Sequence, residues 1–180
     1  MVFNIGQVAP PFNLPNAHPN IGSSKMSLED VMGERGTIIV FSCLHCPYVV
    51  GNIGRIDALA QYAEENALGF VAINSNAANP NYASDSAQRT SEYCENGVAY
   101  PFLIDTNQSV SEEWGAERTP ELYLLDENSS LVYRGRFDDS PKNPGMATTS
   151  DMMDALNQFL SGEKVQNPRT DSIGCSIKWV

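Results

Sequence analysis

Blocks of apolar residues along the first half of the chain predict a strand, a helix and a second strand. The run Thr37–Phe41 is apolar or β-branched throughout, which is typical of a buried central strand. From about Cys43 to Glu65 apolar residues recur at helical spacing, and Leu68–Ile73 returns to a strand pattern. This order predicts a parallel pair of strands joined by a right-handed crossover.

The second half of the chain predicts shorter elements. A helix is expected to begin at Asp85, where capping-box spacing occurs, and to end at Asn96-Gly97. A strand is expected over Tyr100–Ile104. The remaining expected elements are a short helix from Asp105 to Trp114, hairpin strands at Glu121–Leu125 and Leu131–Arg136, and a helix at Asp151–Leu160.

The order of these elements predicts an α/β fold with a mixed central sheet flanked by helices. A parallel unit followed by an antiparallel hairpin fits the thioredoxin arrangement. At 180 residues the chain has the size of one domain, so 1–180 is expected to fold as a unit. Ile5–Pro19 is expected to be an N-terminal extension of loops and short strands, and 161–180 a C-terminal tail packed on or near the domain.

The net charge of the chain argues against two classes of binding partner. A net charge of −11 argues against nucleic acid, whose binding needs a basic face, and against an anionic membrane surface. The longest apolar runs have the length of strands rather than of membrane spans, and Met1–Pro11 lacks the pattern of a signal peptide. A cytoplasmic protein is therefore expected.

Two of the four cysteines, Cys43 and Cys46, stand where the buried strand gives way to the predicted helix. Unpaired amides at a helix N-terminus favour a thiolate, so we expect the pKa of Cys43 to lie below the free value of about 8.5. His45 between them adds positive charge or a hydrogen bond, and Pro47 suits the first turn of a helix. Because the thiolate is the reactive species in disulfide exchange, this pair predicts redox chemistry without a cofactor.

A metal site is the alternative use of these residues. Zinc normally takes four ligands, and the candidates are Cys43, His45, Cys46 and Cys175. The sequence has no second C-x-x-C and no H-x-x-H, which favours redox chemistry and no bound metal. Cys94, near the end of the second predicted helix, is expected to be a structural thiol.

Six stretches of the sequence form a recognisable set. The most characteristic are FSCLHCPYV (Phe41–Val49), which holds a CxHCP motif, and the tail SIGCSIKW (Ser172–Trp179). The other four are IGQVAPPFNLPN (Ile5–Asn16), VAINSN (Val71–Asn76), RTPELYLLD (Arg118–Asp126) and LVYRGRFDDS (Leu131–Ser140). As a set they resemble the thioredoxin-like branch of the redoxin family that is related to alkyl hydroperoxide reductase and thiol-specific antioxidant proteins. The resemblance covers nearly the whole chain.

The resemblance implies a role for several residues. Cys43 is implied to be the exposed nucleophile and Cys46 the buried resolving thiol. Pro120 is implied to be a cis-proline that faces the cysteines and leaves the carbonyl or amide of Thr119 free to pair with a substrate strand. Cys175 matches a cysteine in the tail of this branch and is a candidate auxiliary thiol.

The sequence also departs from thioredoxins proper. Ser42 stands where they carry tryptophan, and the strand Thr37–Phe41 holds no buried carboxylate to accept a proton. The redox potential and the substrate therefore need not be those of thioredoxin.

Three functions follow as hypotheses. The leading one is a thiol–disulfide oxidoreductase in which Cys43 attacks a substrate disulfide and Cys46 resolves the mixed disulfide. The first alternative is a peroxiredoxin-like thiol peroxidase in which Cys46, followed by proline, is oxidised by peroxide, Arg118 holds the peroxide, and Cys43 or Cys175 resolves the sulfenic acid. That family carries Thr or Ser where this chain has Cys43, which weakens the match.

The second alternative is a thioredoxin-fold protein that binds copper or zinc through the cysteine pair and a distant histidine, without turnover. His18 is the only histidine outside the motif, and it is expected to be exposed in a Pro- and Asn-rich loop. For the two enzymatic hypotheses, the expected substrate is a protein or small-molecule disulfide or a peroxide, with an unidentified thiol as electron donor.

Overall fold

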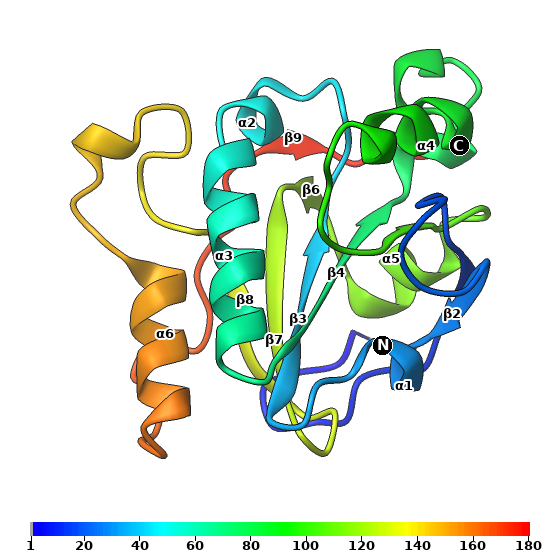
Figure 1. Ribbon diagram of the computed structural model, residues 1–180. Helices are drawn as coiled ribbons and strands as arrows, with labels where there is room; N and C mark the ends of the chain where they lie inside the picture. Colours follow the sequence, from blue (N-terminus) through cyan, green and yellow to red (C-terminus); the bar gives the residue numbers. More distant parts are fainter. Residues whose placement is uncertain (1) are drawn as a thin grey trace.

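A computed structural model describes residues 2–180 (Figure 1). Its centre is a five-stranded sheet in the order β5-β4-β3-β7-β8. The strands β3, β4 and β5 are parallel to one another, and β7 is antiparallel to both of its neighbours, β3 and β8. These strands are β3 (Gly36–Phe41), β4 (Gly69–Asn74), β5 (Phe102–Ile104), β7 (Glu121–Asp126) and β8 (Leu131–Gly135). The mixed sheet, the parallel unit and the late hairpin confirm the expected α/β fold.

Both faces of the sheet are covered because its central strand is apolar on both sides. In β3, Ile38 and Val40 belong to one buried cluster, and Ile39 and Phe41 to the other. The first cluster is completed by α3 (Ile53–Glu65), α4 (Ala87–Glu95) and α6 (Asp151–Leu160). The second is completed by α1 (Leu28–Val31) and α5 (Ser109–Trp114).

Three predicted helix starts are wrong. The short helix expected from Asp105 begins at Ser109. The helix expected from Cys43 begins at Pro47, with Cys46 as its N-cap, and it is divided into α2 (Pro47–Val50) and α3. Proline favours the first helical position because its fixed φ suits the helix and it has no amide to leave unpaired. The helix expected from Asp85 begins at Ala87, because the hydroxyl of Ser86 accepts the amide of Arg89 and caps α4.

The remaining elements are short. The N-terminal extension forms β1 (Asn13–Pro15) and β2 (Lys25–Ser27), and three 3₁₀ turns follow as η1 (Asn76–Ala78), η2 (Ala83–Asp85) and η3 (Pro144–Met146). Near the C-terminus, β9 (Cys175–Ser176) pairs with β6 (Arg118–Thr119). Within residues 2–180, none of the helices is long and apolar enough to span a bilayer.

Candidate functional site

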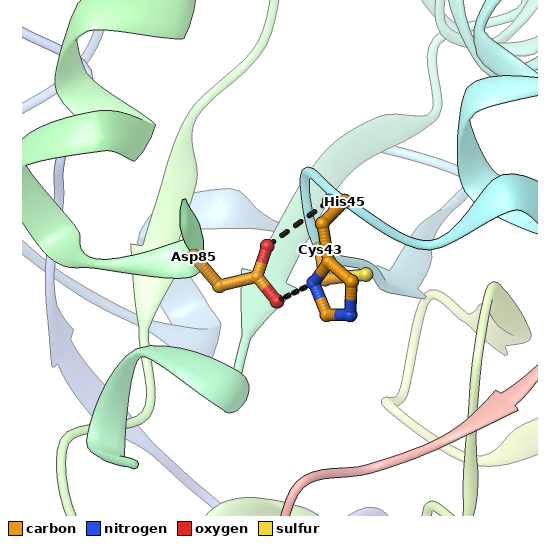
Figure 2. A group of neighbouring side chains, drawn as sticks. All are labelled: Cys43, His45 and Asp85. Atoms are coloured by element: carbon orange, nitrogen blue, oxygen red, sulfur yellow. Dashed lines mark hydrogen bonds and ion pairs between the residues drawn. The ribbon is translucent and has the colours of Figure 1, made fainter. Parts of the chain in front are cut away.

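Four segments meet where β3 ends and α2 begins. The loop between these elements carries Cys43, His45 and Cys46, η2 brings Asp85, and the strands β6 and β9 bring Thr119 and Cys175. Figure 2 shows Cys43, His45 and the carboxylate of Asp85 close together. All four cysteines are free thiols.

The two cysteines of the motif are buried, with exposed fractions of 1% for Cys43 and 0% for Cys46. The expectation that Cys43 is exposed is therefore wrong in this conformation. The Sγ of Cys43 lies 3.3 Å from the hydroxyl oxygen of Thr119, and the Sγ of Cys46 lies 3.4 Å from the carbonyl oxygen of Thr119. The bond between Thr119 and Pro120 is cis, as the resemblance implied. The pair is thus held against the start of β7.

Asp85 holds the loop of the motif in place. Its Oδ1 accepts the amides of Leu44 and His45 at 2.8 and 3.1 Å. Its Oδ2 is bonded to the Nδ1 of His45, drawn as a dashed line in Figure 2, and accepts the side-chain amide of Asn76 at 2.9 Å. The side chain of Asp85 is fully buried, and its hydrogen bonds to the motif loop satisfy the buried carboxylate.

This role of Asp85 was not predicted from the sequence, in which the residue marks the start of a helix. The strand β3 lacks a buried carboxylate, but η2 supplies one from another part of the chain. The Asn-rich segment that begins at Asn74 was the available signal, because Asn76 donates to the carboxylate of Asp85 and Asn74 to its backbone carbonyl.

Negative charge in the reduced site belongs on Cys46. Its pKa is lowered to about 4, chiefly because the Cys43 thiol donates a hydrogen bond to it, with further hydrogen bonds from Cys175 and the amide of Val49. The pKa of Cys43 is raised by the same hydrogen bond, by burial and by the nearby carboxylate of Asp85, while the Thr119 hydroxyl opposes the rise. The pKa of Cys43 is raised rather than lowered as expected, and the direction of both shifts favours Cys46 over Cys43 as the thiolate of the pair.

The backbone of Thr119 is not free. In the antiparallel pair β6–β9, Thr119 faces Cys175 and Arg118 faces Ser176, and the amide of Ile177 donates to the carbonyl of Glu117 at 3.0 Å. The tail of this same chain therefore occupies the strand edge that the resemblance left open for a substrate.

The arginine considered for peroxide binding is bonded to the C-terminal tail. Arg118 is exposed, and its Nη1 donates to the carbonyl of Gly174 at 3.0 Å. Arg134 is the buried arginine of this region: its Nε binds Glu121 Oε1 at 2.8 Å, and both side chains are buried. The other carboxylate oxygen of Glu121 accepts the amides of Glu117 and Arg118, so the pair ties β8 to the start of β7 and to β6.

His18 is not a second metal ligand. It is buried, with its Nε2 2.8 Å from the carbonyl oxygen of Val98, while its Nδ1 accepts the amides of Asn20 and Ile21. The expectation of a solvent-exposed His18 is therefore wrong, since both ring nitrogens are used to close the N-terminal loop.

Three donor atoms near the motif could approach one metal ion. The Sγ of Cys43, a ring nitrogen of His45 and a carboxylate oxygen of Asp85 lie within 4.8 Å of one another. This set replaces the four sulfur and nitrogen ligands considered from the sequence. It is one ligand short of a structural zinc site, and Asp85 already holds the loop amides.

The comparisons with known proteins agree with this picture. The family model described as Redoxin matches residues 5–156, so the chain belongs to the redoxin family. None of the curated protein sequences matches it. Membership in this family supports a thiol-based redox function and oxidoreductase activity in general terms.

Solved structures give the same fold. An uncharacterized conserved protein from Geobacillus kaustophilus is 38% identical over 99% of this chain and 94% of its own, with a TM-score of 0.89. A hypothetical protein from Sinorhizobium meliloti is 31% identical over 100% of this chain and 97% of its own, with a TM-score of 0.87. Peroxidoxin BcpB from Mycobacterium tuberculosis, 15% identical over 87% of this chain and 94% of its own, has a TM-score of 0.58 and supports the fold alone.

Proposed function

We propose that this protein is a thiol–disulfide oxidoreductase in which Cys43 and Cys46 alternate between dithiol and disulfide. The observation that carries the proposal is the burial of both thiols side by side against Thr119, whose hydroxyl and carbonyl oxygens lie 3.3 and 3.4 Å from the two sulfurs, together with the lowered pKa of Cys46. A thiolate is needed to open a substrate disulfide, and a neighbouring thiol is needed to release the product.

In the proposed exchange the Cys46 thiolate attacks a substrate disulfide RS–SR, forms a bond to one sulfur and expels the other as RS⁻. Cys43 then attacks Cys46 in the mixed disulfide and expels the second RS⁻, which leaves a Cys43–Cys46 disulfide. The substrate gains two electrons and the pair loses two. This order reverses the roles that the resemblance implied, because the charge is on Cys46.

Cys43 must lose its proton for the second step, and the site offers an acceptor. The carboxylate of Asp85 and the ring of His45 lie within 4.8 Å of the Cys43 sulfur. Bonding of Cys46 to the substrate also removes the hydrogen bond to Cys46 that is the largest cause of the raised Cys43 pKa. We therefore propose Asp85 and His45 as the positioning and proton-accepting groups for Cys43.

Substrate entry requires the tail to move, because both sulfurs are buried. The strand β9 has two residues, so few backbone hydrogen bonds hold it. We propose a protein or small-molecule disulfide as the substrate, a thiol as the electron donor, and the cytoplasm as the compartment.

A thiol peroxidase is the second candidate. The low pKa of Cys46 and the following Pro47 favour it. The guanidinium of Arg118, which that chemistry would use, is bonded to Gly174 instead. Disulfide exchange is therefore the better-supported function.

The experiment that separates them mixes the reduced protein with one equivalent of glutathione disulfide or of hydrogen peroxide and follows thiol loss. We expect loss of two thiols with glutathione disulfide, release of two glutathione molecules and a Cys43–Cys46 bond in the peptide map. Reaction with peroxide should be no faster than that of a simple low-pKa thiol. Fast oxidation by peroxide with no exchange would refute the proposal and favour the peroxidase.

A further inference from the structure

The C-terminal segment Gly174–Ile177 is built against β6. Its strand β9 places Cys175 opposite Thr119, and Gly174 touches the same residue. A Cβ atom on Gly174 would lie 2.2 Å from the carbonyl oxygen of Thr119 and 2.7 Å from its carbonyl carbon, so a side chain is not tolerated there. The close approach fixes where Cys175 lies.

The last residues of the chain are held by buried polar side chains. The amide of Lys178 donates to Asn76 Oδ1 at 2.9 Å, and Gln108 donates to the carbonyl of Lys178 at 2.9 Å and accepts the amide of Val180 at 2.9 Å. Asn76 also donates to Asp85, the residue that holds the motif loop. The tail and the thiol loop therefore share one anchor.

This arrangement places a third thiol, that of Cys175, beside Cys43 and Cys46. Cys175 pairs with Thr119, whose carbonyl oxygen lies 3.4 Å from the Cys46 sulfur, and it packs on the cluster that contains both active cysteines. Its hydrogen bonding is one cause of the lowered pKa of Cys46. Cys43 and Cys46 are at most 1% exposed, whereas Cys175 is partly exposed. Cys175 is thus the most exposed residue of the three cysteines.

We propose that Cys175 is a redox thiol of this site: it resolves a disulfide formed on Cys46, and the resulting Cys46–Cys175 bond is the form that a thiol electron donor reduces. The inference rests on the proposed disulfide exchange and adds the point where the donor attacks. Cys175 pairs with Thr119 at the strand edge where the resemblance places a substrate strand, so its thiol takes the position of a substrate cysteine.

The step is balanced. In a disulfide between Cys46 and R, where R is Cys43 after the exchange or a substrate thiol before it, Cys175 attacks the Cys46 sulfur, the bond to R breaks, and R leaves as a thiol with the proton of Cys175. Two donor thiols then reduce the Cys46–Cys175 bond and leave as their own disulfide. A donor attacking Cys175 expels Cys46, whose low pKa makes it a good leaving group.

The protonation states suit this order. Burial and the hydrogen bond and charge of Cys46 raise the pKa of Cys175 to about 11, so it is unreactive while Cys46 is a thiolate. Once Cys46 is bonded to R, the second and third of these causes disappear. Cys175 is therefore activated by the intermediate that it resolves.

The test compares Cys43→Ser with Cys43→Ser/Cys175→Ser after addition of glutathione disulfide, acid quenching and alkylation, using intact mass and peptide mapping. Removal of Cys43 leaves Cys175 as the only proposed resolving thiol. We expect the single variant to lose glutathione and to carry a Cys46–Cys175 bond, while the double variant retains glutathione on Cys46. The control Cys43→Ser/Cys94→Ser should behave as the single variant, because Cys94 is buried in α4.

Equal retention of glutathione by the single and double variants would overturn the role of Cys175 and leave the proposed exchange intact. An unmodified Cys46 in both variants would overturn the proposed function and this inference together. Circular dichroism and the melting temperature of each variant establish that its fold is kept.

Discussion

Replacing Asp85 with asparagine should lower the pKa of Cys43. The carboxylate of Asp85 lies within 4.8 Å of the Cys43 sulfur, so at an effective dielectric constant of about 20 its charge opposes the Cys43 thiolate by about 3 kcal/mol. That energy corresponds to about two pKa units. Removing the negative charge favours the thiolate, so the pKa of Cys43 falls.

The assay is an ultraviolet titration of thiolate absorbance, made in a Cys46→Ser background so that only Cys43 responds in the pair. The same substitution weakens the contacts of Oδ2 with His45 and Asn76. Hydrogen bonds to a charged group contribute about 1.5–3 kcal/mol each, so the free energy of unfolding should also fall by about that amount.

Asp105→Asn is the matched control. Asp105 is also fully buried, and it accepts the amide and hydroxyl of Ser111 at 2.8 Å, at the start of α5. We expect a similar loss of stability and no change in the Cys43 titration. An unchanged or raised Cys43 pKa in Asp85→Asn, or an equal shift in both variants, would refute the reasoning.

Three other predictions follow from the structure. Arg134→Met leaves the buried carboxylate of Glu121 without its partner and should cost about 3–5 kcal/mol in urea unfolding, and a loss below about 1 kcal/mol would mean that the pair behaves like an exposed one. Gly174→Ala should displace the tail, because its Cβ would meet the Thr119 carbonyl, and N-ethylmaleimide should then label the active pair faster than in Gly145→Ala, where the nearest atom lies at 3.6 Å. Equal labelling of the two would contradict the docking of the tail. Protein purified without chelator should carry far less than one equivalent of copper or zinc by metal analysis, and a full equivalent would favour the metal-binding function.

The local elements of the fold were predictable from the sequence. The run Thr37–Phe41 formed the central strand, the hairpin formed at Glu121–Asp126 and Leu131–Gly135, and the last helix covers Asp151–Leu160 as expected. Each depends on periodicity over a few neighbouring residues, which the sequence displays directly. The cysteine motif was visible for the same reason.

The parts of the site that were missed depend on contacts between distant residues. Asp85 binds an amide 41 residues away, and His18 binds a carbonyl 80 residues away. Arg134, a charged residue within a hairpin strand, is buried because Glu121 compensates its charge. No local pattern reveals such partners, and the direction of the Cys43 and Cys46 pKa shifts depends on them.

The measurement that tests the account most directly is the thiolate titration of the reduced wild-type protein, compared with Cys46→Ser. We predict one thiolate that forms with a midpoint near pH 4, since the pKa of Cys46 is lowered to about 4, and that is absent from Cys46→Ser. A midpoint at the free-thiol value of about 8.5, or a low-pH thiolate that survives in Cys46→Ser, would contradict the assignment of Cys46 as the reactive thiolate.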